Sequence, residues 1–161
     1  MATDCFLKVE GIPGESTDKA HKNEFELTSW SFGVGNPAPT TRSATNSGTS
    51  QRCYHQDFTF TKEMDKATPL LFLFCCKGDH IPTITLTQRR SAGPAPIEFV
   101  KYVLKDSVIT SHNISGGFGI PTESVSINYG TISVTYLDAN SADGQSGNVA
   151  ASWDCFQNVE K

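Results

Sequence analysis

The sequence predicts a mainly β protein, a β-barrel of two packed antiparallel sheets with one short helix. Three observations carry this prediction. Apolar and polar residues alternate in most segments, which gives about eight strands at the period of two that half-buried strands require. Only residues 69–77 carry both the start and the stop signals of a helix. Stretches rich in Gly, Pro, Ser and Asn separate the strand-like segments, as is usual in barrels and sandwiches.

The first part of the chain predicts short strands followed by a long loop. Apolar positions alternate over 4–10, and the glycines and proline of 11–14 end that strand. They alternate again over 25–32, but the phase slips by one residue near Thr28, which predicts a bulge or a bend. Residues 33–51 hold almost nothing apolar and predict a long extended loop. Loops of this length are usually functional, or they order on binding.

After a further strand that ends near Phe60, one short helix is expected over 69–77. Thr68 suits the N-cap, and Pro69 suits the first helical position, where its missing N–H costs nothing. Gly78 suits the left-handed residue past the end of the helix. Because the segment is apolar nearly all round, the helix is expected to be largely covered.

The next strands are the longest. Residues 83–87 alternate Thr with Ile and Leu, and a turn rich in Gly and Pro follows. Residues 97–111 carry apolar side chains on both phases of the alternation. A strand that is apolar on both faces needs both faces covered, so the second face must meet a helix, another sheet or another subunit.

The last third of the chain predicts three strands. Residues 113–121 form a flexible turn with three glycines. The alternation over 125–129 continues over 132–136 with a slip of one residue at Gly130, which predicts a bulge there because the interval is too short for a hairpin. The final strand-like segment, 149–159, follows a polar, Gly-rich stretch.

Length and charge exclude several classes of protein. The 161 residues fit a single domain over 1–161. The formal net charge of −4 argues against a general binder of nucleic acid or of anionic membranes. The longest apolar run, 70–76, is far shorter than the ~20 residues that span a membrane. Residues 1–10 show no basic segment followed by an apolar one, so no secretory signal is expected.

The reactive residues form no known catalytic or metal-binding pattern. The five cysteines are odd in number and include no C-x-x-C pair, so we expect free, small, buried side chains in a reducing compartment. No histidine has metal-ligand spacing, and solvent-facing or loop positions are expected for all of them. No G-x-S-x-G motif occurs, and 116–119 lacks the G-K-[ST] ending of a phosphate loop. We therefore expect no enzyme, no cofactor and no metal, but a binding or structural protein.

Several motifs, in one order along nearly the whole chain, resemble those of the Hcp proteins, which form the inner tube of bacterial type VI secretion systems. They are Gly14-Glu15-Ser16 with His21, Ser29-Trp30-Ser31, the segment 60–69, Thr85-Leu86-Thr87 with Arg89-Arg90, Pro121-Thr122-Glu123, and Trp153-Asp154 with Asn158.

The resemblance implies a specific assembly. Six copies of the barrel would form a ring, and rings would stack into a hollow tube, with sheath proteins, a spike protein and a baseplate as partners. The tube would carry small effector proteins in its lumen, with neither nucleic acid nor membrane insertion involved. The chain would be made in the bacterial cytoplasm and exported without a signal peptide.

Two loops are hypothesised to serve this assembly. The long polar loop could order against the next ring, with the ring-stacking residues Ala38, Thr40, Arg42, Thr45, Ser47 and Thr49. The flexible segment that follows the longest strand could line the lumen and touch cargo, with the residues Ser111, Asn113, Ser115, Gly116 and Gly117.

Two other functions remain open from the residues alone. A carbohydrate-binding β-sandwich could use Trp30 and Trp153 as stacking platforms, but both lie in strand patterns beside apolar residues, so core packing is predicted for them. A small β-fold hydrolase would need a nucleophile and a base in a recognisable pattern, which the sequence does not offer.

Overall fold

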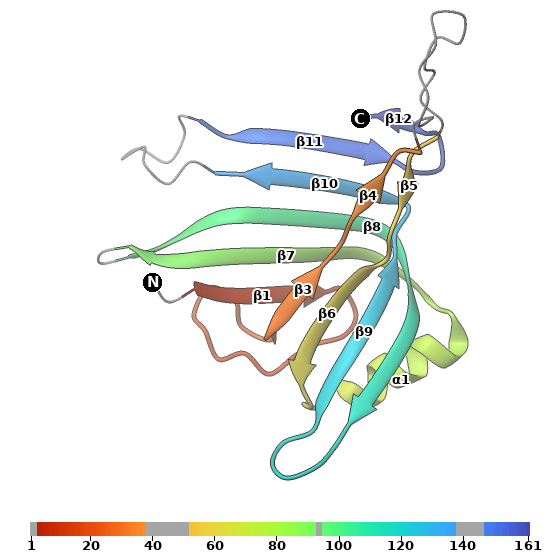
Figure 1. The fold of residues 1–161 in the computed structure, drawn as a ribbon. Coiled ribbons are helices and arrows are strands. Elements are labelled where there is room, and N and C mark those ends of the chain that lie inside the picture. Colours follow the sequence, from red (N-terminus) through yellow and green to blue (C-terminus); the bar gives the residue numbers. More distant parts are fainter. Residues whose placement is uncertain (1–2, 38–51, 93–94, 138–146) are drawn as a thin grey trace, which may run out of the picture.

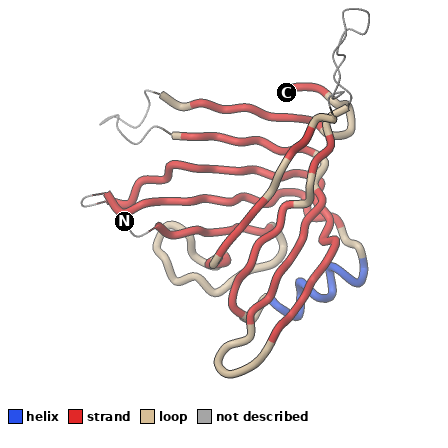
Figure 2. The backbone as a smooth tube through the Cα atoms, viewed as in Figure 1, coloured by secondary structure: helices blue, strands red, loops and turns tan. Residues whose placement is uncertain are grey.

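The structure, a computed structural model, describes residues 3–37, 52–92, 95–137 and 147–161. These residues form one helix and twelve strands (Figures 1 and 2). The helix is α1 (Thr68–Lys77). The strands are β1 (Thr3–Val9), β2 (Phe25–Glu26), β3 (Ser29–Ser31), β4 (Val34–Gly35), β5 (Tyr54–His55), β6 (Phe58–Glu63), β7 (His80–Ala92), β8 (Ala95–Ser115), β9 (Thr122–Asn128), β10 (Thr131–Tyr136), β11 (Val149–Asp154) and β12 (Val159–Glu160).

The strands form two layers that share β8. One layer has the order β12-β11-β10-β8-β7-β1-β2, and the other consists of β3, β6 and β9, which joins the first through β8. Ten strands therefore belong to one continuous antiparallel sheet that folds over on itself, and β4 with β5 forms a separate two-stranded ribbon (Figure 1). The prediction of a mainly β fold with one short helix is confirmed.

The phase slip near Thr28 marks the place where the chain changes layer. Before it, β2 pairs with β1; after it, β3 pairs with β6. The N–H of Leu27 still donates to the Cys5 carbonyl at 3.0 Å, whereas the N–H of Thr28 donates to the Thr61 carbonyl at 2.9 Å. The predicted bend is confirmed, and its cause is the transfer of the chain between layers.

A second change of layer occurs along β8 at Asp106. Leu104 is buried before this residue, whereas Ser107 and Ile109 are buried after it, so the inward phase shifts by one. Asp106 has a φ of 52°, a conformation that interrupts the regular alternation. The apolar residues on both phases of 97–111 therefore arise in part from this shift, which corrects the expectation of one strand with two apolar faces.

The chain passes from β9 to β10 at Gly130, beside this irregularity. Both strands run antiparallel to β8, so they form no hairpin with each other, as predicted. The N–H of Gly130 donates to the Lys105 carbonyl at 3.0 Å. A Cβ atom on Gly130 would lie 2.2 Å from the Phe156 ring, so a larger residue here would displace that exposed ring.

The core fills the space between the layers. Phe25, Phe58 and Phe60 are fully buried there. Trp30 packs against this core, with its ring 6.1 Å from that of Phe58, and Trp153 packs against it from β11. Core packing, rather than an exposed stacking platform, is thus confirmed for both tryptophans.

The helix begins one residue earlier than predicted. Ala67 is its N-cap, and Thr68 lies inside the first turn. The Thr68 hydroxyl accepts the N–H of Asp65 and donates to Glu123, so it serves a tertiary contact rather than the predicted cap. The end is as predicted: Gly78 is left-handed with a φ of 66°, and its N–H donates to the Phe74 carbonyl at 2.9 Å.

The expectation that this helix is largely covered is wrong for the single chain. Only Thr68 and Leu71 are buried, because α1 packs against β8 with one side. The side chains of Leu70, Phe72 and Leu73 are 37%, 58% and 44% exposed. Among the described residues, no helix has the length and apolar character to cross a membrane.

Candidate assembly surface

The residues hypothesised to face the lumen lie together at one end of β8. Ser111, Asn113 and Ser115 share one phase of the strand, and Gly116 and Gly117 begin the turn that leads to β9. Asn113 and Ser115 are exposed. The six residues hypothesised for ring stacking, from Ala38 to Thr49, fall outside the described residues.

The sequence-based interpretation missed a buried charged cluster. Lys62 and Glu123 are register partners on β6 and β9, with side chains 1% and 0% exposed, and they form an ion pair. Lys62 Nζ also lies 2.7 Å from Asp65 Oδ1 and 5.0 Å from the centre of the Phe25 ring. The other Glu123 oxygen lies 2.7 Å from His112 Nε2. The cluster joins β6, β8, β9 and the start of α1, and every charged group in it has a partner.

The alternation of apolar and polar residues along β6 and β9 already indicated that the charged residues of this cluster point inward. Lys62 continues the phase of Phe58 and Phe60, and Glu123 precedes Val125 and Ile127 on theirs, so each charged residue stands at an inward position of its strand. The expected solvent-facing or loop position is wrong for His112, whose side chain is 2% exposed. Within the described residues, no group of three or more His, Cys, Asp or Glu side chains could hold a metal ion.

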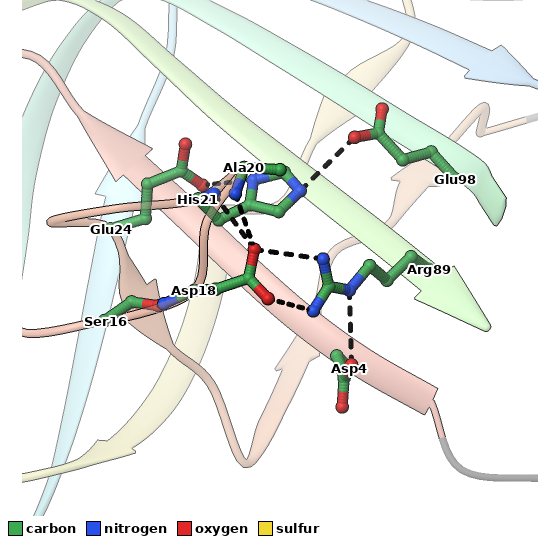
Figure 3. A network of polar contacts seen from close by, with 8 residues as sticks. All are labelled: Asp4, Ser16, Asp18, Ala20, His21, Glu24, Arg89 and Glu98. Atoms are coloured by element: carbon green, nitrogen blue, oxygen red, sulfur yellow. Dashed lines mark hydrogen bonds and ion pairs between the residues drawn. The ribbon is translucent and has the colours of Figure 1, made fainter. Parts of the chain in front are cut away.

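A second polar network fastens the loop between β1 and β2 to the sheet (Figure 3). Arg89 of β7 binds both carboxylate oxygens of Asp18, with Nη1 3.1 Å from Oδ1. Its Nε donates to Asp4 Oδ2 at 3.2 Å, and its guanidinium lies 4.7 Å from the centre of the Phe6 ring. The loop is therefore held by a bidentate charge pair, the strongest form of an Arg–carboxylate contact.

His21 adds a further contact in the same network. Its ring stacks on Phe6, with the ring centres 4.4 Å apart. Nδ1 lies 2.9 Å from Glu24 and Nε2 lies 3.2 Å from Glu98 of β8 (Figure 3). The residue is 6% exposed, so the solvent-facing expectation is wrong for His21 as well. Both polar networks have structural partners at every charged group, and neither forms a cleft with a nucleophile and a base.

The Arg89–Asp18 pair predicts an acid-dependent stability. The hydrogen bonds from Arg89 lower the pKa of Asp18 to about 2. A carboxylate with a depressed pKa in the folded state stabilises it above its unfolded pKa, and this stabilisation disappears as the pH falls through the folded value. Asp18→Asn should therefore reduce the free energy of unfolding near neutral pH, and the difference from the wild type should vanish between about pH 4 and pH 2.

Denaturant unfolding across this pH range measures the effect. Asp79→Asn is the matched control, because the partner of Asp79 among the described residues is Lys77, and their side chains are 37% and 56% exposed; ion pairs in contact with water contribute little. An Asp18→Asn difference that stayed constant down to pH 2 would contradict the assignment.

The cysteines agree with the prediction only in part. All five are free. Cys76 is exposed and the other four are half-buried, so the expectation of buried side chains is wrong. Burial raises the pKa of Cys5 to about 12, which keeps that thiol protonated and unreactive.

The outer edge of β11 is open. β12 pairs only with Trp153 and Asp154, and the Lys161 N–H donates to the Ser152 carbonyl at 3.2 Å. Alternate residues of a strand direct their backbone groups to opposite sides, so Ala150 directs its N–H and C=O outward, as Ser152 does. Within the described residues, no strand pairs with this side over Val149–Ala151.

This edge lacks the features that usually prevent strand pairing. Charges, prolines and bulges protect natural sheet edges, and the three residues of the open segment are Val, Ala and Ala. Three exposed apolar side chains lie beside it. Val149 belongs to the segment, Tyr136 is its register partner on β10, and Val34 lines a groove together with Ala151.

The opposite edge of the same layer is also incomplete. β2 pairs with β1 at Phe6 and Leu7, which leaves Thr3 and Asp4 without a described strand on that side. β11 and β1 lie on opposite sides of the layer (Figure 1). The molecule thus carries two different open edges, which suit contacts with other copies better than they suit a closed monomeric barrel.

The comparisons with known proteins decide the family. A sequence model described as Type VI secretion system effector, Hcp, matches residues 6–136. The chain belongs to the Hcp family. Protein hcp1 of Pseudomonas aeruginosa is 34% identical over 164 residues, with 99% of each chain covered. The crystal structure of Hcp1 from Salmonella typhimurium has a TM-score of 0.82 and 30% identity, with both chains covered completely.

A further solved structure, described as a type six secretion system protein, has a TM-score of 0.88 and 25% identity over 99% of this chain and 100% of its own. The resemblance found in the sequence is thereby confirmed. Hcp proteins are structural components of type VI secretion without enzymatic activity, which agrees with the predicted function class. The Hcp fold, mainly β with one short helix and a large antiparallel sheet, is the fold described above.

Proposed function

We propose that this Hcp protein assembles into six-membered rings that stack into a hollow tube, which type VI secretion expels together with small effector proteins. The observation that carries this proposal is the open, uncharged edge of β11, beside which the side chains of Val34, Tyr136 and Val149 are exposed. Such an edge is an aggregation hazard in a monomer but a useful contact in an assembly.

The two open edges favour a ring over a twofold dimer. They belong to different strands, β11 and β1, so a contact between them joins unlike surfaces of two copies. Contacts of this kind are heterologous, and they close into a ring when the rotation between neighbours allows it. The family resemblance supplies the number six, which corresponds to about 105 kDa for a chain of 17.5 kDa.

The roles of the two loops remain proposals. Ser111, Asn113, Ser115, Gly116 and Gly117 would face the lumen, and their small, uncharged side chains suit transient contacts with varied cargo. The residues from Ala38 to Thr49 would contact the next ring. Sheath, spike and baseplate proteins would be the other partners, and export would need no signal peptide.

Substitution at the open edge tests the assembly. Ala150→Pro removes an outward N–H that has no described partner and should leave the pairing between β10 and β11 intact. We expect rings of about 105 kDa from the wild type and single chains from Ala150→Pro, measured by light scattering, with hollow particles visible by electron microscopy only for the wild type. Ala150→Ser keeps the N–H and is the matched control.

The outcomes separate the alternatives. Rings that persist in Ala150→Pro, with circular dichroism unchanged, would remove the β11 edge from the contact. A wild type that stays a single chain at high concentration would contradict the proposed function and favour a monomeric binding module.

A further inference from the structure

An apolar groove of about 470 Å³ lies between the β4–β5 ribbon and the strands β10 and β11. This volume falls within the range of binding pockets, ~300–1,000 Å³. Apolar side chains from both sides line it, namely Phe32, Val34, Ile132 and Val134. His55 and Trp153 also line it, and each has a buried ring nitrogen, Nε2 and Nε1 respectively, with no hydrogen-bond partner in the described part of the chain.

Both of these nitrogens are buried and do not reach the surface of the groove. Trp153 Nε1 always carries a hydrogen. His55 Nδ1 lies 3.1 Å from the Tyr129 hydroxyl; burial raises the pKa of Tyr129 and lowers that of His55. Which of the two atoms donates in this contact depends on the tautomer of His55. The groove therefore offers mainly the surface of its apolar side chains, which favours an occupant with an exposed apolar side chain.

The same chain presents a segment of this kind elsewhere. Phe118, at the tip of the turn between β8 and β9, is fully exposed at 112% of its reference area, and Ile120 is 63% exposed. Gly117 and Gly119 flank Phe118, so its backbone carbonyls are unshielded by neighbouring side chains. Phe118 makes no contact with the core clusters of its own chain, and a large aromatic side chain held in water at a turn tip suits a protein contact.

The turn and the groove lie at opposite ends of the molecule. The turn between β8 and β9 is at the lower end of Figure 1, whereas β4, β5 and β11 are at the upper end. One chain cannot fill its own groove with this turn, but a row of copies can fill every groove with the turn of a neighbour. Such a contact is again heterologous and leaves no free turn or groove in a closed ring.

We propose that the Phe118 turn of one copy inserts into the His55–Trp153 groove of the next copy in the ring. The Phe118 ring packs on the apolar wall that Phe32, Val34, Ile132 and Val134 form. This inference rests on the proposed ring, names the side chains that join its neighbours, and places Gly117 at this contact rather than in the lumen.

A cross-linking experiment tests this contact, because Cys53 lines the groove. In Phe118→Cys, the new thiol should lie beside Cys53 of the neighbouring copy. Treatment of the full-length protein with diamide, an azo oxidant, would form a disulfide; the two thiols lose two electrons and two protons, which reduce diamide to its hydrazine. We expect a ladder of covalent multimers up to the ring size on non-reducing gels.

Phe118→Cys with Cys53→Ser is the matched control, because it keeps the other four thiols and should lose the ladder. Phe118→Ser should also weaken the ring, with dissociation at a concentration roughly tenfold higher or more. Rings that form normally in Phe118→Cys but give no Cys53-dependent link would overturn this inference and leave the proposed function standing. A wild type without rings would overturn both.

Discussion

Replacement of Glu123 by Ala should cost about 3–5 kcal/mol of the free energy of unfolding, the range found when one member of a buried ion pair is removed. The carboxylate binds Lys62, His112 and the Thr68 hydroxyl at once. Without it, the Lys62 ammonium keeps only Asp65 as a counter-ion in a site where its side chain is 1% exposed. A buried charge that loses one of its two partners is costly because the protein interior cannot replace its hydration.

Denaturant unfolding at one protein concentration measures this effect, since assembly also stabilises the folded chain. Glu63→Ala is the matched control: Glu63 neighbours Lys62 on β6 but is exposed, and a change within about 0.5 kcal/mol is expected. Glu123→Gln, which keeps the shape and part of the hydrogen bonding, should fall between the two. Equal losses for Glu123→Ala and Glu63→Ala would show that the cluster does not stabilise the fold.

This cluster shows what the sequence could and could not reveal. The strand phases place Lys62 and Glu123 at inward positions, and that signal was available from the alternation alone. Their pairing was not, because it depends on the register between β6 and β9, which are more than fifty residues apart along the chain. Period-two patterns fix which residues point inward, whereas pairing across a sheet is set by contacts distant in sequence.

The helix and strands were predictable because their signals are local in the sequence. The pairings between strands depend on residues that are distant in the sequence. The helix was located to within one residue by its local signals at Pro69 and Gly78. Thr68 failed as an N-cap because a tertiary partner, Glu123, takes its hydroxyl. The slips at Thr28 and Gly130 were visible as changes of phase, but only the structure identifies them as passages between layers.

The candidate assembly surface could not be predicted from the sequence. The apolar pattern of 97–111 indicated a need for a partner, but part of that pattern reflects the phase shift at Asp106. The open edge over Val149–Ala151 depends on which strands β11 lacks, and no local pattern encodes a missing neighbour. Motif order alone identified the family, because a shared order of weak motifs is more specific than any one of them.

Phe60→Ala should lower the free energy of unfolding by about 3–5 kcal/mol, the range for removal of a buried Phe side chain. Phe60 is fully buried, lies between Trp30 of β3 and Val125 of β9 in the sheet, and its ring is 6.2 Å from that of Phe25. Both layers converge on this position, so the structure has little freedom to collapse into the cavity. Denaturant unfolding measures this loss, which should appear as a lower midpoint concentration of denaturant.

Phe72→Ala is the matched comparison, because hydropathy alone rates the two residues equally. Phe72 lies on α1 and is 58% exposed, so its removal opens no cavity in the single chain and should change the free energy of unfolding by less than about 1 kcal/mol. A loss at Phe72 as large as that at Phe60, measured on dissociated chains, would mean that the helix is covered after all, as its apolar pattern suggested. A small loss would place the outer face of α1 on the surface of the single chain, where it is free to contact another protein.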